Sequence, residues 1–271
     1  MVKNLKLKCL LVGLITVISG GVHANAESFS VKNEAQLTRS INKLKAYDTL
    51  IIEKDLKLKK NLYLDKSVVL DLNGNTLYIS SSNSSIIVGR KFPKIKKKCF
   101  LDVLKLKNDT DKFNYDDDIN VIIKNGTIIH SDGLKGKNGK KNSWIDFCGK
   151  DGTTPKETIS FESGKLTLSN VTINAGNGGN GGNGSYQALV HCIFGGGIGG
   201  RGGAAGNGAD AIKILRNECI LSTDDTVVLN EGKAGKLGKN SKANPNYFAY
   251  KAYTLKNNSK ATDGQKINNC F

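Results

Sequence analysis

The feature that most constrains this chain is a three-residue beat of glycine. In the stretch INAGNGGNGGNGSYQ, Gly176, Gly179 and Gly182 keep the period, and a second glycine series follows it in phase. A flexible linker needs glycine but has no reason to hold a phase. The period therefore predicts a folded element. It recurs in four runs, at Gly133–Gly139, Gly176–Gly184, Gly197–Gly206 and Gly232–Gly238.

Three residues per turn is the period of the polyproline-II helix, which makes no internal hydrogen bonds. Such helices can pack side by side if one face is bare glycine and the backbone groups bond to neighbouring helices. A collagen helix does not fit, because the chain has three prolines and the runs are short. The runs resemble the glycine-rich bundles of springtail antifreeze proteins and of some phage tail-tip adhesins. We expect a flat bundle with backbone hydrogen bonds between the runs.

A nucleotide-binding loop is a weaker interpretation of the same residues. Gly176, Gly178 and Gly181 satisfy G-x-G-x-x-G, but no helix cap and no βαβ unit follow them. The run GGGIGGRGG lacks the Lys-Ser/Thr pair of a P-loop. Calcium-binding nonapeptide repeats require an Asp where asparagine stands here.

Four short segments repeat a strand pattern in which apolar residues alternate around an asparagine and a threonine or cysteine. This recurrence at unequal intervals predicts a solenoid, in which each unit buries its face by stacking on the next. Thr76, Thr127, Thr172 and Cys219 occupy matching places in the proposed alignment. The segments are LNGNTLYI (Leu72–Ile79), IKNGTIIH (Ile123–His130), LSNVTINA (Leu168–Ala175) and LRNECILS (Leu215–Ser222).

The segment from Val31 to Ile79, with YDTLII and VVLDLNGNTLYI, resembles the opening of right-handed parallel β-helix proteins of the pectin-lyase-like type. The resemblance implies an all-β fold, a right-handed parallel β-helix. Together with the glycine period, it predicts a β-helix with inserted glycine-rich, polyproline-II-like helices. It also implies a short capping helix, which Asn33 and Gln36 can cap at its start. The apolar face of that helix is Leu37, Ile41 and Leu44. The strand residues expected to point inward are Leu70, Leu72, Ile128, Leu168, Ile173 and Ile214.

Residues 1–26 predict a cleaved export signal, with lysines, an apolar stretch and an Ala-Asn-Ala site. The alternative, a membrane anchor, needs roughly 20 apolar residues. We expect a capping strand and helix over 27–46 and a β-helix over 47–230 with glycine-rich insertions at 133–152 and 176–208. A glycine-rich run and C-terminal segment follow over 231–271. The product would be secreted or on the cell surface, without a transmembrane segment; its oligomeric state is open.

Charge and cysteine content exclude some function classes. Removing residues 1–26, which hold three lysines and no acid, lowers the net charge from +16 to +13. Such a charge favours anionic partners, but the lysines are scattered and no aromatic-basic signature predicts a nucleic-acid partner. Five cysteines then remain, with no C-x-x-C pair, so no metal site is expected. Cys219 is predicted to be a small buried residue in the strand repeat.

Carboxylates give little sign of an enzyme. The only acidic pair on a late repeat unit is Asp224 and Asp225, and adjacent strand residues point to opposite faces. The acidic stretch Asn108–Asp118 does not match an EF-hand and is predicted to be a solvated insertion. We expect no catalytic residue and no cofactor. Ice binding would require flat threonine arrays, and Thr76, Thr127 and Thr172 are few and expected to point inward.

The segments between glycine runs carry the only tryptophan of the chain and several other aromatic residues. If the runs are rods that leave the body and return, then KNSWIDFCGK and SYQALVHCIF form the rod tips. Cys148 and Cys192 would meet there in a disulfide. We predict a non-catalytic, adhesin-like or surface-scaffold protein that binds a glycan or a host or cell-surface ligand. The alternative for the tip segments is a small cap that covers the end of the bundle. The alternative for the whole protein is a carbohydrate-active enzyme (polysaccharide lyase or glycoside hydrolase). The candidate binding residues are Trp144, Phe147, Tyr186, His191 and Phe194.

Overall fold

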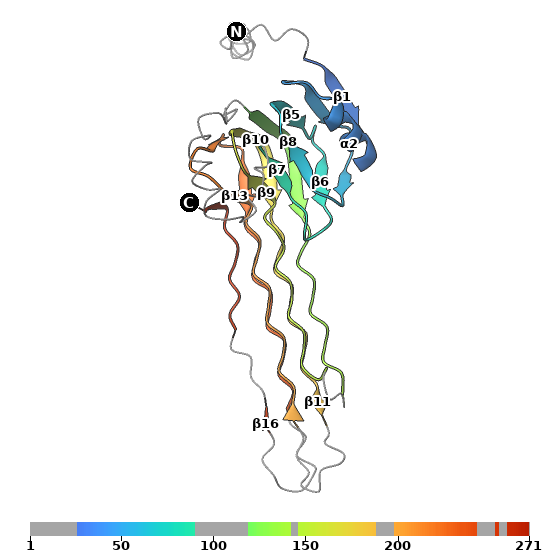
Figure 1. The fold of residues 1–271 in the computed structure, drawn as a ribbon, viewed down its shortest axis with the longest axis vertical. Helices are drawn as coiled ribbons and strands as arrows, with labels where there is room; N and C mark the ends of the chain where they lie inside the picture. Colours follow the sequence, from blue (N-terminus) through green and yellow to red (C-terminus); the bar gives the residue numbers. More distant parts are fainter. Residues whose placement is uncertain are drawn as a thin grey trace, which may run out of the picture.

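The computed structural model describes residues 26–89, 119–141, 146–187, 198–242, 253–254 and 259–270. These residues form an all-β structure with one helix, and nearly all strand pairs are parallel. The main sheets make up a body at one end of the molecule, from which long extended segments run to the other end (Figure 1). Within the described ranges, no helix is long and apolar enough to cross a membrane.

Successive passes of the chain add one strand to each of three parallel ladders. The first two ladders belong to one nine-stranded sheet, because β8 and β10 run through both. The first ladder contains β1 (Ser28–Val31), β2 (Thr49–Ile52), β5 (Val68–Asp71), the start of β8 (Asn120–His130), the start of β10 (Lys165–Asn174) and β14 (Ile220–Thr223). The second contains β3 (Leu56–Leu58), β6 (Thr76–Ile79), the ends of β8 and β10, and β15 (Val228–Asn230). The third ladder is a five-stranded sheet of β4 (Leu62–Leu64), β7 (Ile86–Val88), β9 (Ile159–Phe161), β13 (Ile212–Ile214) and β17 (Ile267–Asn269).

Asparagines make the bends between the first and second ladders. Asn73, Asn125 and Asn170 have φ angles of 50°, 60° and 51°, in the left-handed region that asparagine tolerates better than most residues. The Asn170 side-chain amide donates to Asn125 Oδ1 at 3.3 Å, and the Asn125 amide donates to Asp71 Oδ1 at 3.2 Å. The bends of successive passes are therefore stacked and linked to one another.

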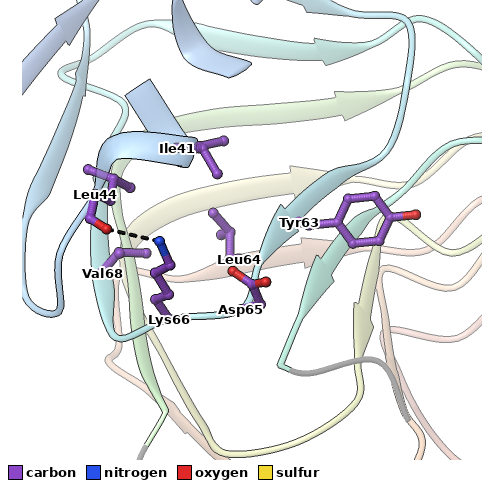
Figure 2. Close-up of a pocket in the computed structure, with 7 residues that line it drawn as sticks. All are labelled: Ile41, Leu44, Tyr63, Leu64, Asp65, Lys66 and Val68. Carbon is purple, nitrogen blue, oxygen red and sulfur yellow. Dashed lines mark hydrogen bonds between the residues drawn. The ribbon is translucent and has the colours of Figure 1, made fainter. Parts of the chain in front are cut away.

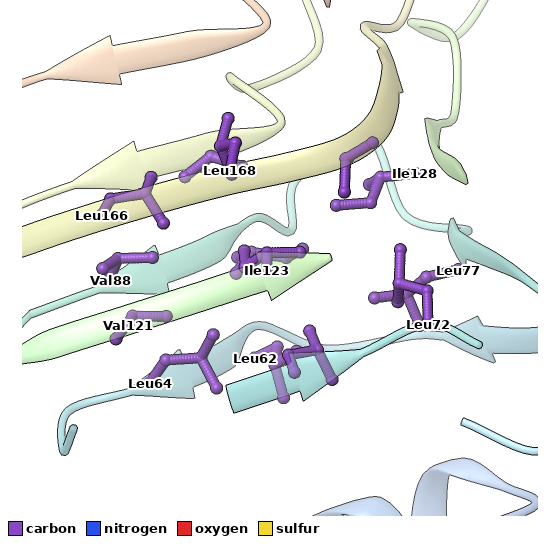
Figure 3. Packing of buried hydrophobic residues seen from close by; sticks show 14 of the residues in the cluster. Leu62, Leu64, Leu72, Leu77, Val88, Val121, Ile123, Ile128, Leu166 and Leu168 are labelled. Atoms are coloured by element: carbon purple, nitrogen blue, oxygen red, sulfur yellow. The ribbon is translucent and has the colours of Figure 1, made fainter. Parts of the chain in front are cut away.

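The core lies between the ladders and follows the alternation of the strands. All of the six residues predicted to point inward are buried, with Ile214 the most exposed at 7 %. Aliphatic side chains stack in columns, as in the register Leu70–Ile123–Leu168 and in the pair Ile128–Ile173. Figure 3 shows Ile123 and Leu168 of these columns stacked on neighbouring strands in the interior. Each added pass thus extends one continuous apolar core.

The predicted capping helix is present as α2 (Glu34–Lys43). The Asn33 carboxamide accepts a hydrogen bond from Gln36 N at 2.9 Å, which confirms the cap. Leu37 and Leu44 are buried, and Ile41 packs against the core. A pocket beside the helix end, closed by a hydrogen bond from Lys66 Nζ to the Leu44 carbonyl, holds only about 10 Å³ (Figure 2). That volume suits one water molecule, not a ligand.

Two predictions about the threonine column were wrong. Thr76, Thr127 and Thr172 are indeed in register, but the next member is Val228, not Cys219. Paired residues of β10 and the last pass differ in number by 55 at Leu168–Thr223 and by 56 at Thr172–Val228. The turn between β14 and β15 therefore has one residue more than the corresponding bend in β10. The column also faces outward: its members are partly exposed, while Leu77, Ile128 and Ile173 in the next positions are fully buried.

Cys219 instead precedes β14. Its side chain is half-buried, packs against the core and lies 3.7 Å from the Phe161 carbonyl oxygen. Desolvation by this burial raises the pKa of the thiol, which keeps it in the neutral form at physiological pH. Cys219 is thus a packing residue, as its small apolar side chain predicts, but in a different place from the one expected.

Candidate functional site

Three times the chain leaves the body where the second ladder ends, and it returns where the third ladder begins (Figure 1). We call the extended segments outgoing and returning rods. The outgoing rods, after β8, β10 and β15, are residues 131–141, 175–185 and 231–242; the returning rods, before β9, β13 and β17, are residues 146–157, 200–211 and 259–266. The glycine runs therefore leave the body and return to it, as expected.

Backbone hydrogen bonds join the rods, which confirms the predicted bundle. Between the first and second outgoing rods, Gly133 and Gly136 N–H donate to the carbonyls of Asn177 and Asn180 at 2.7 and 2.8 Å. The rising numbers on both sides make these rods parallel. Between the second outgoing and second returning rods the order reverses: Gly203 donates to Gly182 and Gly206 to Gly179.

The returning rods are parallel to one another in the same way. Gly149 and Gly152 N–H donate to the Arg201 and Ala204 carbonyls, both at 2.8 Å. The bundle therefore has two layers of three rods, parallel within each layer and antiparallel between layers. Glycine N–H groups of one rod thus donate to carbonyls of another, and these contacts between rods satisfy the backbone.

The number of glycines in each rod follows from its neighbours. In the second outgoing rod, an added Cβ at Gly179 would overlap the Leu134 carbonyl of the first rod, and one at Gly178 would overlap the Gly206 carbonyl of a returning rod. This central rod has neighbours on two of its three faces, so two residues in three are glycine. None of the rod glycines has a positive φ. Glycine is required here for close approach, and not for an unusual backbone conformation.

A small sheet closes the described part of the far end. It contains β11 (Tyr186–Gln187), β12 (Ile198–Gly199) and β16 (Tyr253–Thr254), with β11 and β12 antiparallel and β12 and β16 parallel. Tyr253 was missed by the sequence reasoning, because no glycine period leads to it.

The predicted tip residues Phe147 and Tyr186 come together at this end. The Phe147 carbonyl accepts from Ser185 N at 2.7 Å, which holds the two aromatic positions on neighbouring rods. Lys141 Nζ lies 4.9 Å from the centroid of the Tyr186 ring, a cation–π contact. Asp146 makes ion pairs with Lys140 and Lys150, at 3.9 and 3.7 Å. Trp144, His191 and Phe194 lie outside the described residues.

The predicted disulfide stays a prediction. Cys148, half-buried at the start of the first returning rod, forms no disulfide with another described residue, and its predicted partner Cys192 lies outside the described residues. Cys270 is a free, exposed thiol.

Asp71 and Asp224, two carboxylates of the first ladder, lie far apart. Asp71 in β5 pairs with Lys124 at 3.4 Å. Asp224 follows β14, which is three strands away from β5 in the first ladder, so the two carboxylates are roughly 14 Å apart at the usual spacing between strands. Within the described residues, no group of three His, Cys, Asp or Glu side chains could hold a metal ion. An open groove of about 410 Å³ lies between the returning rods and the third ladder, but its Asp210 already accepts from Gln265 N and the Asn268 amide.

The Asp224 carboxylate links the last pass to β10. Hydrogen bonds from the side chains of Ser169 and Thr226, with the backbone N–H groups of Thr226 and Asn170, lower the pKa of Asp224 to about 2. This is a structural arrangement, since the carboxylate joins the turn of the last pass to Ser169 and Asn170 of β10.

We expect a pH signature from Asp224. The hydrogen bonds favour the charged form, so their stabilisation is complete above the ordinary pKa of 3.8 and is lost as pH falls toward 2. Carboxyl-carbon NMR titration should show the low pKa. Melting curves from pH 2 to pH 6 should show a weaker acid dependence in Asp224→Ala. Asp225→Ala, which removes the exposed neighbour, should keep the full dependence; an Asp224 titrating near 4 would contradict the assignment.

No protein-family model, no curated protein and no solved structure matches this chain.

Proposed function

We propose that the stacked passes of the body form a right-handed parallel β-helix of the pectin-lyase-like type. The continuous parallel register of three ladders, the stacked asparagine bends and the helix α2 at the first strand support this fold. Crossover connections between parallel strands of one sheet are right-handed in about 98 % of cases, which favours the right-handed form.

We propose that the protein is an exported, non-catalytic binding protein of the adhesin or surface-scaffold kind, which contacts a glycan or another cell-surface ligand through the far end of its rods. The observation that carries this proposal is the placement of Phe147 and Tyr186 on neighbouring rods at that end. An eleven-residue rod spans roughly 35 Å at the polyproline-II rise, so these residues are held well away from the body.

The rods also reduce the cost of binding. Ordering loose side chains and loops at an interface opposes association, and a preorganised support avoids much of that loss. Here the glycine packing and the bonds between rods fix the backbone that carries the aromatic residues. Aromatic side chains beside a lysine suit contact with sugar rings and polar ligands.

The rival function, a carbohydrate-active enzyme on the same fold, would need two carboxylates about 5–10 Å apart. Asp71 and Asp224 are farther apart than this, and Asp71 is neutralised by Lys124. We therefore do not propose catalysis by these groups. The export signal of residues 1–26 and a secreted or surface location form part of the binding proposal.

A glycan array probed with residues 27–271 tests the proposal. The double variant Phe147→Ala/Tyr186→Ala is expected to lose at least about tenfold in affinity for an uncharged glycan that the parent binds, since aromatic anchors dominate contact energies. The matched control is Tyr78→Ala, which removes an aromatic ring from the outer face of β6 in the body. Equal losses in both variants, or binding to no glycan and no cell surface, would contradict a binding tip.

A further inference from the structure

The outer face of the outgoing layer carries a straight row of asparagines. Asn177, Asn180 and Asn183 are exposed, one per turn of the central outgoing rod. The other two positions in each turn of that rod are glycines that contact neighbouring rods. The asparagines can therefore point only away from the bundle, and successive ones are roughly 9 Å apart at the polyproline-II rise.

These asparagines are oriented by the next rod. Their Oδ1 atoms accept hydrogen bonds from the backbone N–H groups of Lys233, Lys236 and Lys239 at 2.9, 2.7 and 2.9 Å. Since the side-chain oxygen is engaged, the amide NH₂ group of each asparagine is directed toward solvent as a donor. The row thus presents fixed donors, not freely rotating side chains.

Lysines lie on both sides of the row. The bonds from Gly136 to Asn180 and from Gly181 to Lys236 put Lys135, Asn180 and Lys236 at nearly one level, with Lys239 one turn farther on. Within the described residues, Lys135, Lys236 and Lys239 make no ion pair. Lys233, nearest the body, is already paired with Glu231 at 2.7 Å and with Asp263 at 3.7 Å.

The positive charge belongs to one face of the bundle. On the opposite, returning face, the corresponding outward positions include Asp151, Arg201 and Asp210, and both carboxylates accept backbone hydrogen bonds. In the outgoing rods the described carboxylates lie at the body end: Asp132 accepts from Asn177 N, and Glu231 is paired with Lys233. Lysines are spread over the whole chain, but those at the outward positions of the outgoing rods thus lie together on one side of the bundle.

We propose that this lane, the asparagines 177, 180 and 183 with Lys135, Lys236 and Lys239 beside them, binds a linear polyanionic glycan lying along the rods. A straight row of cations and amide donors with a regular repeat matches a straight chain of carboxylate or sulfate groups and hydroxyls. The lane itself contains no aromatic residue on which bases could stack and no apolar side chain; the exposed Leu134 and Leu237 occupy the next positions of the two flanking rods. It shares no residue with the tip and does not depend on the tip function.

Binding of heparin, a sulfated linear glycan, to residues 27–271 tests the lane. The variant Lys135→Gln/Lys236→Gln/Lys239→Gln is expected to weaken binding about tenfold and to reduce the dependence of affinity on salt, because fewer counterions are released. The matched control is Lys54→Gln/Lys57→Gln/Lys60→Gln, which removes the same charge from exposed positions in the body. The control should lose less than about twofold, and both variants should melt like the parent, because glutamine keeps every backbone N–H.

Three results would overturn the proposal. The first is an equal loss of heparin binding in the two triple variants, which would mean attraction by net charge alone. The second is tighter binding to phosphatidylserine vesicles or to duplex DNA than to heparin. The third is no heparin binding by the parent at low salt. The double tip variant Phe147→Ala/Tyr186→Ala should bind heparin normally, so that failure of the lane and failure of the tip are distinguished.

Discussion

Replacing Gly179 by valine is expected to cost at least about 3 kcal/mol in the free energy of unfolding and to separate the rods. The added Cβ would overlap the backbone carbonyl of Leu134 on the first outgoing rod, which cannot rotate away as a side chain could. The same residue donates its N–H to Thr153 and accepts from Gly206, so a shift of this rod disturbs three neighbours at once. Thermal and denaturant unfolding measure the loss.

The matched control for this variant is Asn180→Val, one residue farther along the same rod. It adds the same side chain on the open face and removes only the hydrogen bond to Lys236 N, which is worth about 1 kcal/mol. A flexible linker would tolerate both substitutions equally. Equal melting temperatures for the two variants would therefore contradict the packed bundle.

Replacing Phe161 by alanine should cost about 3–5 kcal/mol, since it is the largest fully buried side chain of the core and its removal leaves a cavity. Phe161 lies in β9, where its carbonyl also accepts from Leu215 N at the start of the last pass. The same substitution at Phe147, which is half-buried at the far end, is expected to cost less than about 1 kcal/mol. A similar loss at both positions would mean that the tip, too, is part of the stabilising core.

Local patterns predicted much of the architecture because they report local constraints. Alternation identified which residues of β5, β8 and β10 point into the core, and the Asn33 cap marked the start of α2. The glycine phase predicted rods held by bonds between them, since only close packing requires glycine at a fixed period. For the same reason the doubled glycines at Gly178 and Gly181 signal a central rod, although the sequence alone does not reveal which rods are its neighbours.

Features that depend on distant parts of the chain were not predictable. The third returning rod lies at the edge of the bundle and makes few close contacts with other rods, so it has one glycine, Gly264. Its sequence therefore shows no three-residue glycine period. The alternation in LRNECILS predicts that Cys219 belongs to the threonine column. The turn before Val228 is one residue longer in the last pass, so the residue that pairs with Thr172 is Val228. The lysine lane likewise depends on the first and third outgoing rods lying on either side of the second, an arrangement that the sequence does not show.

The bonds between rods also determine how the bundle carries force. They run across the rods, so a pull on the far end along the rod direction loads them in shear. Many bonds must then yield together, whereas a peeling force would break them one at a time. Each rod pair is also continuous with strands of two ladders, so tension passes directly into the stacked body. The bundle should therefore resist extension along the rods, although it is built from glycine, a residue usually associated with flexibility.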